Sequence, residues 1–425
     1  MALGVPKMVE QMNWNLYKEI LSIDSTSGKE RKLAEWLLEH LEAPAKQAME
    51  VGDGTLNLLF SWGTPKVVFC THLDTVPPYI APCFGGKLPP EDLSTPGQGQ
   101  RFPEGTGGGG LVHPRTSIGG GARWIQVPEG DAGDNGRGRN ERSEYSPPAA
   151  CSSLEAIFGR GTCDAKGQIF AMYEACKALE AKGCRDFGLL LLAGEETGSG
   201  GAKAFSKTGF EAPFLIVGEP TENKMVSAAK GTLSYDLKFE GKAFHSGYPE
   251  FGESAIDKFN EFYNKLKAKD FGEDPELGKT TWNVGLLRSD NPQNILSPEV
   301  TCRLYFRTTF VSHEAVKAWM QEMAGHDGSA HGPKGVIPGL TGDLRGGDVP
   351  ARYVTLPGFE SAPVAFGSDA PHLTGFGHKI ICGPGSIRFA HRPDEHILPQ
   401  ELEAAIGLYT RLYATLMAGA QSIDS

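Results

Sequence analysis

Acidic residues and a histidine follow three apolar segments of this sequence. The run VVFCTH ends at His72 and leads to Asp74, FGLLLLAG is followed by Glu195 and Glu196, and FLIVG by Glu219. His72 and Asp74 lie on one face, because alternate residues of a strand point the same way. Two adjacent carboxylates beside a buried strand are costly unless a cation compensates their charge. The pattern therefore indicates a cation site.

Two further candidates lie between and beyond these segments. Asp164 stands in the Gly-rich turn FGRGTCDAKGQ, and His391 follows another apolar run in KIICGPGSIRFAHRPDEHI. Each residue also has an ordinary alternative: a helix N-cap for Asp164, a surface position for His391, a capped strand end for His72 and a solvated loop for the paired glutamates. We interpret their recurrence at successive strand ends as one shared site.

The residue types define the chemistry. Two histidines and three carboxylates, with one Glu and one Asp to spare, suit a pair of divalent ions of borderline hardness, zinc first, with cobalt or manganese as substitutes. Two ions about 3.5–4 Å apart, bridged by a carboxylate and a water, would acidify that water and polarise a substrate carbonyl. The sequence therefore predicts a hydrolase.

The elements that must position these residues alternate along the chain. Residues 66–72, 187–194 and 214–218 read as strands buried on both faces, and 165–183 as an amphipathic helix that ends at Gly183. This alternation predicts an α/β fold with a mainly parallel sheet flanked by helices. The ligand site of such a sheet lies at the carboxyl ends of its strands.

The pattern of apolar and polar residues changes from about residue 224. Antiparallel-type strand patterns and one amphipathic helix predict a small α+β unit over 224–330, inserted into a larger domain made of 1–223 and 331–425. Residues 83–153 differ again, with 16 Gly and 8 Pro but only seven Ile, Leu or Val. We expect this stretch to be a disordered insertion, because it cannot bury enough apolar surface to offset the entropy of ordering.

The whole chain excludes several classes of protein. A net charge of -11 over 425 residues argues against nucleic acid as a partner, and no apolar stretch approaches the length of a membrane span. The eight cysteines form no C-x-x-C pair, which is typical of reduced thiols. The first residues lack the pattern of a signal peptide, so we expect a cytoplasmic protein.

Together these motifs resemble the M20 metallohydrolases, which include acetylornithine deacetylase, succinyl-diaminopimelate desuccinylase, aminoacylase and carboxypeptidase. The resemblance covers about 1–82 and 154–425. It implies two zinc ions bridged by Asp164. The ligand sets it implies are His72, Asp164 and Glu219 for one ion, and Asp164, Glu196 and His391 for the other.

The resemblance also assigns roles to residues that bind no metal. It implies that Glu195 is the general base and acid, and that Asp74 orients His72. It further implies that the inserted unit, 224–330, is a lid that forms a homodimer, with His245 reaching a neighbouring active site. Substrate-binding positions would be Asn294 and Arg307 in the lid and the backbone of Gly385 and Ser386; a structural salt bridge for Arg307 and a plain turn for GPGS stay open.

GPGSIRFAHRPDEHI and HSGYPEFGESAI look most like acetylornithine deacetylase. We therefore expect a dinuclear zinc amidohydrolase that removes the acyl group from an N-acyl amino acid, N-acetylornithine first. The alternative within this class is an M20 di- or carboxypeptidase or an aminoacylase acting on a small N-acyl amino acid or short peptide. The alternative of another class is a non-catalytic metal-binding protein, inactivated because the stretch 83–153 displaces Asp164.

Overall fold

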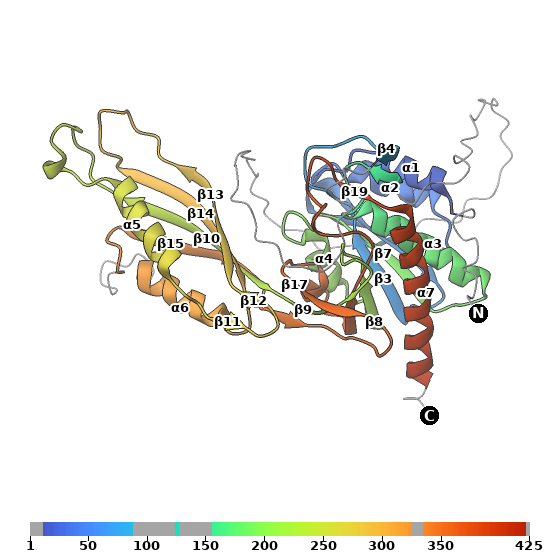
Figure 1. The fold of residues 1–425 in the computed structure, drawn as a ribbon. Helices are drawn as coiled ribbons and strands as arrows, with labels where there is room; N and C mark the ends of the chain where they lie inside the picture. Colours follow the sequence, from blue (N-terminus) through green and yellow to red (C-terminus); the bar gives the residue numbers. More distant parts are fainter. Residues whose placement is uncertain (1–11, 88–123, 127–154, 325–334, 422–425) are drawn as a thin grey trace, which may run out of the picture.

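The computed structural model describes residues 12–87, 124–126, 155–324 and 335–421, which form two lobes (Figure 1). The smaller lobe is Gly231–Gly346, and the remaining described residues make up the larger lobe. A seven-stranded sheet forms the centre of the larger lobe. In spatial order its strands are β18 (Phe376–Ile381), β8 (Ala212–Val217), β3 (Val67–His72), β7 (Phe187–Leu192), β2 (Thr55–Trp62), β1 (Ala45–Val51) and β5 (Trp124–Gln126).

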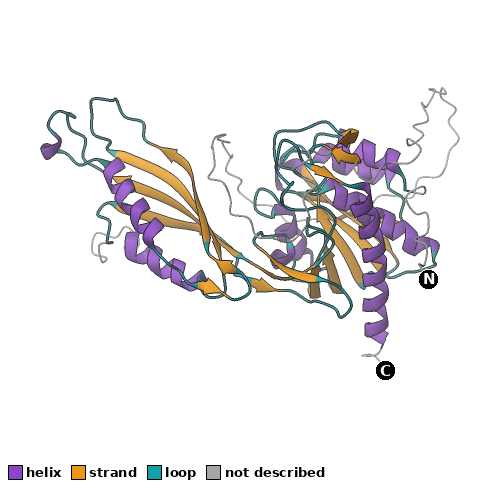
Figure 2. Ribbon diagram, in the orientation of Figure 1, coloured by secondary structure: helices purple, strands orange, loops and turns teal. Residues whose placement is uncertain are grey.

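The first four strands of this sheet are parallel, and the last three join it antiparallel. Helices cover both faces (Figure 2). One face carries α1 (Trp14–Ser22), α2 (Arg31–His40), α3 (Lys166–Ala181) and α7 (Pro399–Gln421), and the other carries α4 (Gly200–Phe205). The predicted α/β class with a mainly parallel sheet and flanking helices is confirmed.

Strand β3 shows why this sheet must be covered on both sides. All six of its residues are buried. Val67 and Phe69 belong to the core under α3 and α7, whereas Val68 and Cys70 belong to the core on the opposite face. The continuous apolar run is thus explained by alternate side chains that enter two different cores.

The smaller lobe is a four-stranded antiparallel sheet backed by two helices. Its strands, in spatial order, are β13 (Thr281–Arg288), β14 (Glu299–Thr308), β10 (Gly231–Glu240) and β15 (Leu340–Gly346), and its helices are α5 (Ala255–Ala268) and α6 (His313–Ala324). A short hairpin, β11 (Glu273–Asp274) and β12 (Gly278–Lys279), follows α5.

The sheet of the smaller lobe begins and ends at other residues than the predicted unit, 224–330. β9 (Met225–Ala229) pairs with β16 (Ala351–Arg352) and β17 (Ser361–Val364), so it does not join the sheet of the smaller lobe. β15 pairs with β10, so that sheet continues to Gly346. The sequence pattern does not mark these limits, because Lys230 alone separates β9 from β10 and because β15 presents mostly exposed side chains.

Two parts of the stretch 83–153 are described, residues 83–87 and 124–126, and both are strands. β5 pairs with β1 at the edge of the large sheet. β4 (Cys83–Lys87) pairs with β6 (Glu155–Phe158), which in turn pairs with β19 (His396–Ile397). The rest of 83–153 lies outside the described residues.

Among the described residues, no helix combines the length and apolar character needed to cross a bilayer. The seven described cysteines form no disulfide with one another. The remaining short elements are the 3-10 turns Gly52–Gly54, Ser206–Thr208, Pro249–Phe251 and Ala370–His372.

Candidate metal centre

Three neighbouring parallel strands end at the same edge of the large sheet. β3 lies between β7 and β8, and His72 at its end is in register with Leu192 at the end of β7. The chain leaving β7 supplies Glu195 and Glu196, and the chain leaving β8 supplies Glu219. Because parallel strands place their carboxyl ends together, residues more than a hundred positions apart in sequence meet here.

Asp164 enters this group from the loop between β6 and α3. Its Oδ1 lies 3.0 Å from His72 Nε2, and its Oδ2 lies 3.3 Å from His391 Nε2. His391 Nε2 also lies 2.9 Å from Glu196 Oε1. Asp164 is buried, so its two oxygens are held toward two different histidines. This is the arrangement that a bridging carboxylate requires.

Two sets of potential ligand atoms follow from this arrangement. In each set the three atoms lie within 4.8 Å of one another. The sets are His72, Asp164 and Glu219, and Asp164, Glu196 and His391. A third overlapping set joins His72 to Glu195 and Glu196. The five residues that the sequence proposes as ligands are therefore brought together in one place.

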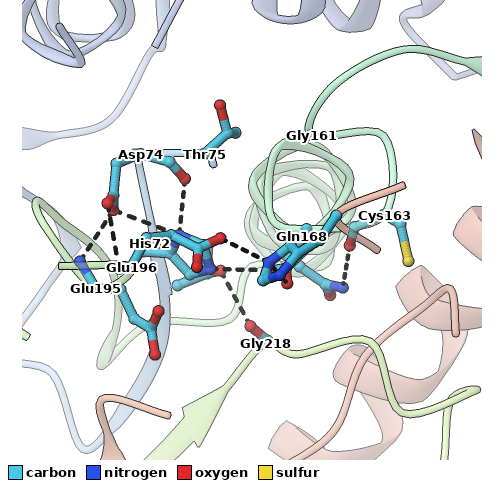
Figure 3. A network of polar contacts seen from close by, with 12 residues as sticks. His72, Asp74, Thr75, Gly161, Cys163, Gln168, Glu195, Glu196 and Gly218 are labelled. Atoms are coloured by element: carbon cyan, nitrogen blue, oxygen red, sulfur yellow. Dashed lines mark hydrogen bonds and ion pairs between the residues drawn. The ribbon is translucent and has the colours of Figure 1, made fainter. Parts of the chain in front are cut away.

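Asp74 contacts the His72 ring more closely through its backbone oxygen than through its carboxylate. The backbone oxygen of Asp74 lies 2.9 Å from His72 Nδ1, whereas its carboxylate Oδ1 is 3.5 Å away. The carboxylate instead accepts hydrogen bonds from the backbone N–H groups of Glu195 (3.0 Å) and Glu196 (3.2 Å) (Figure 3). It also accepts one from Ser27 Oγ (2.9 Å). Asp74 thus fixes the His72 ring through its main chain and fixes the paired glutamates through its side chain.

The carboxylates of this group repel one another in a dry environment. Burial raises the pKa of Glu195, Glu219 and Glu196, and neighbouring carboxylates, Asp164 among them, raise it further. Ionised carboxylates at this density are unfavourable without positive charge. Bound cations would supply that charge.

The two histidines show the opposite effect. Hydrogen bonds to Asp164 and Glu196 raise the pKa of His391 to about 10. Burial lowers the pKa of His72, but its interactions with Asp164 and Asp74 outweigh burial and hold the pKa well above its ordinary value. Burial likewise opposes ionisation of Asp164, but both histidines hold its pKa below the ordinary range. In the metal-free chain, protonated histidines thus provide the positive charge at this site.

The donor set fits divalent metal ions. It contains two imidazole nitrogens and carboxylate oxygens, the ligands that zinc, cobalt and manganese accept, and it offers three per ion, as catalytic zinc sites do. The remaining coordination positions would then be free for water or substrate.

The residues expected to bind substrate lie in three places. In the smaller lobe, His245 and Asn294 are exposed in adjoining loops, where Ser246 N donates to the Asn294 oxygen at 2.9 Å. His245 Nδ1 accepts from Gly247 N at 3.1 Å. The loop between β10 and α5 lies at the end of the smaller lobe that points away from the large sheet (Figure 1). The five proposed ligands, His72, Asp164, Glu196, Glu219 and His391, together with Glu195 are called the ligand group. Within one chain, the structure does not bring His245 and Asn294 to this group.

Arg307, near the end of β14, is half-buried with its guanidinium 5.0 Å from the centre of the Tyr305 ring. Gly385 and Ser386 lie beside the loop of Asp164, where Cys163 Sγ donates to the Ser386 oxygen at 3.2 Å. Gly385 has φ +79°, and a Cβ there would lie 2.6 Å from Cys163 Sγ, so only glycine fits. The Ser386 hydroxyl is already used, because it donates to Glu222.

Sequence reasoning missed three residues that support this group. Ser27 donates to Asp74, and Arg160 and Glu395 form a buried ion pair beside Asp164. Nothing in the local pattern marks Ser27, which lies 47 positions from Asp74. Glu395 lies four residues after His391, but its role could hardly be recognised from the sequence, because acidic residues are mostly exposed at the surface.

Comparison with known proteins places these observations in context. Residues 227–330 match the M20-type peptidase dimerisation domain. A probable carboxypeptidase of Aspergillus oryzae is 29% identical, with 94% of this chain and 89% of the relative aligned. A probable carboxypeptidase of Aspergillus flavus is 35% identical, over 61% of this chain and 66% of the relative.

Solved structures share the fold. A tripeptidase from Staphylococcus aureus superposes with a TM-score of 0.59 at 16% identity, covering 94% of this chain and 96% of its own. An M20 family metallo-carboxypeptidase from Sulfolobus solfataricus gives a TM-score of 0.58 at 15% identity, covering 93% and 97%. At these identities the likeness establishes the common fold alone.

Proposed function

We propose that this chain, which belongs to the M20 family of metal-dependent hydrolases acting on amide bonds, is a dinuclear zinc peptidase that cleaves short peptides at a terminal residue. One observation carries the proposal: the two carboxylate oxygens of Asp164 face two different histidines, at 3.0 and 3.3 Å. A carboxylate shared in this way is what a two-metal hydrolytic site needs.

In this proposal His72 and Glu219 complete one metal site, Glu196 and His391 complete the other, and Asp164 belongs to both. The ions, when bound, would acidify a water molecule and polarise the scissile carbonyl. Asp74 keeps Glu195 and Glu196 in place through their backbone N–H groups, so the chain between the ligand positions is fixed before substrate arrives.

Glu195 is the residue we assign to proton transfer. Its carboxylate lies in the ligand group with His72 and Glu196, and burial raises its pKa well above the ordinary value. A carboxyl group with a raised pKa can take a proton from the attacking water and return it to the leaving amine. Glu195 makes this exchange without serving as a ligand.

The relatives favour a peptidase over the N-acetylornithine deacetylase expected from the sequence motifs. Curated relatives are named probable carboxypeptidases, and the shared fold occurs in peptidases. Deacetylation of N-acetylornithine remains the second candidate, supported by GPGSIRFAHRPDEHI. Both reactions hydrolyse a linear amide beside a carboxylate, so the same metal site would serve either one.

The smaller lobe supports a homodimer in which His245 acts on a second copy. It carries the peptidase dimerisation domain, and the exposed loop of His245 points away from the ligand group of its own chain. A histidine supplied by the partner would stabilise the oxyanion, and Asn294 and Arg307 would hold the substrate carboxylate. Gly385 and Ser386 would contact substrate through their backbone.

The test combines metal analysis with parallel assays. Purified protein loaded with zinc should hold two ions per chain and hydrolyse dipeptides faster than N-acetylornithine, N-acetylmethionine or succinyl-diaminopimelate. Faster turnover of N-acetylornithine would overturn the peptidase assignment and leave the metal site intact. Fewer than two ions per chain, without activity on any substrate, would favour the non-catalytic alternative.

A further inference from the structure

We propose that the buried ion pair Arg160–Glu395 is a positioning device that holds the three ligand-bearing loops in register, and that metal affinity depends on it. The inference rests on the proposed function, because it concerns the same ligands. Neither residue belongs to the ligand sets. Both side chains are almost fully buried, at 2% and 0% exposed, with Arg160 Nη1 2.6 Å from Glu395 Oε2.

Glu395 holds the loop that carries Asp164. Its Oε1 accepts hydrogen bonds from the backbone N–H groups of Gly161 (3.0 Å), Cys163 (3.0 Å) and Asp164 (3.1 Å). Gly161 has φ +88°, which turns the chain so that these N–H groups converge. The backbone of the bridging residue itself is thus fixed by one carboxylate oxygen.

Arg160 connects the other two loops to this one. Its Nε donates to the Pro78 oxygen at 3.2 Å, in the loop that follows His72 and Asp74. Its Nη1 also lies 3.3 Å from the Arg392 oxygen, one residue after His391. The pair therefore contacts the loops of His72, Asp164 and His391 at the same time.

The charges explain why an amide would not replace Glu395. All four of its partners are donors: three backbone N–H groups and one guanidinium. A carboxylate accepts from all of them, whereas a glutamine would turn an NH2 group toward a donor. Removing one partner of a buried pair also leaves the other charge uncompensated.

A purely structural role would not require this pair. Burying two charges costs solvation energy, and apolar residues of similar volume often stabilise a core equally well. Its contacts with three segments that carry or follow a proposed ligand point instead to orientation of the ligands. Changing residues that orient metal ligands typically weakens metal binding about 10–100-fold.

The first experiment measures zinc binding to the full-length chain, stripped of metal and titrated calorimetrically. E395Q should bind zinc at least about tenfold more weakly than the unaltered chain. D236N is the matched control, because it removes a carboxylate charge and two arginine contacts in the smaller lobe. L412A controls for lost stability, because it opens the core of the larger lobe. Unchanged zinc affinity in E395Q, or equal losses in L412A, would overturn the proposal.

The second experiment needs no metal and separates this inference from the proposed function. Hydrogen–deuterium exchange of the metal-free chain should be faster over residues 159–164 in E395Q, and unchanged there in D236N. If the unaltered chain binds no zinc, the proposed function fails while this measurement still tests the positioning role. If exchange over 159–164 is the same in E395Q and in the unaltered chain, the positioning role fails whatever the metal content.

Should E395Q not fold, the milder R160K serves in both experiments. Lysine keeps the charge toward Glu395 but loses the fork that reaches Pro78 and Arg392 together. Weaker zinc binding and faster exchange, both smaller than a full loss, support the proposal. Behaviour identical to the unaltered chain contradicts it.

Discussion

The polar residues of the larger lobe and those of the smaller lobe are held in different ways. In the larger lobe Asp74 and Asp164 are buried, and their oxygens make hydrogen bonds to several separate segments. In the smaller lobe His245 and Asn294 are exposed, and their contacts stay within adjoining loops. The polar residues of the larger lobe are thus fixed by contacts within their own chain, whereas those of the smaller lobe are accessible to a partner chain.

This difference separates two functions. The five proposed metal ligands all lie in the larger lobe of one chain, so we expect metal binding to survive changes in the smaller lobe. The proposed role of His245 in oxyanion stabilisation would need a second copy, because the loop between β10 and α5 lies at the outer end of the smaller lobe (Figure 1). Substitutions in the two lobes should therefore have separable effects on metal content and on turnover.

The largest expected effect is that of E195Q. Glutamine keeps the size and the backbone contact to Asp74 but cannot carry a proton, so kcat should fall about 10³–10⁴-fold, near the upper range for general acid–base catalysis. Zinc content should remain two ions per chain. The control E299Q changes an exposed glutamate of the smaller lobe paired with Lys238 and should keep full activity. Activity retained in E195Q would remove Glu195 from the mechanism.

H245A should lower kcat about 10²–10³-fold, the range for loss of one oxyanion donor, with no change in zinc content. Mixing H245A and E195Q chains sharpens the comparison between the lobes. If each site takes its histidine from the partner, a mixed dimer contains one site with both residues intact, and activity should reappear. A mixture as inactive as its parents would show that His245 does not act in trans.

D74N should have a smaller effect, of about 10–100-fold on zinc affinity, because an amide cannot accept all three of its donors. The donors are the N–H groups of Glu195 and Glu196 and the Ser27 hydroxyl. S27A, which removes only one of them, is the graded control. Calorimetric zinc titration measures both variants. Equal zinc affinity in D74N and the unaltered chain would mean that these contacts do not position Glu196.

The residues of the proposed metal site could be selected from the sequence because strand ends are local features. An apolar run followed by His72, Glu196 or Glu219 can be recognised without any tertiary information, and parallel strands bring such ends together. Asp164 and His391 are harder to recognise, because a helix N-cap and a surface position explain them equally well in isolation. Only their occurrence together with the strand-end residues indicated one shared site.

Features set by long-range contacts could not be predicted in this way. The use of the Asp74 carboxylate by the backbone of Glu195 depends on the register of β3 with β7. The extension of the smaller lobe to Gly346 depends on pairing with β10, more than a hundred residues earlier. The stretch 83–153 does not displace Asp164 from the ligand group, since Asp164 Oδ1 lies 3.0 Å from His72 Nε2.

The smallest effect concerns pH. In the metal-free chain, the pKa values of Glu195, Glu196 and Glu219 are raised mainly by burial, so the folded chain binds more protons than the unfolded chain once pH exceeds their ordinary range. The free energy of unfolding then falls as pH rises. His391 acts in the same direction: its contribution is complete below its ordinary pKa of 6.5 and is lost as pH rises through about 10.

The metal-free larger lobe should therefore melt at lower temperature as pH is raised from about 6 to about 9, whereas zinc, which takes the place of the protons, should flatten that dependence. Asp164 does not oppose this trend, because its lowered pKa matters only below its ordinary value of 3.8. Calorimetric scans of chelator-treated and zinc-loaded protein across this range measure the difference. If melting temperature depends on pH in the same way in the two samples, bound metal does not offset the repulsion among the buried carboxylates of the larger lobe. The electrostatic difference between the lobes would then be contradicted.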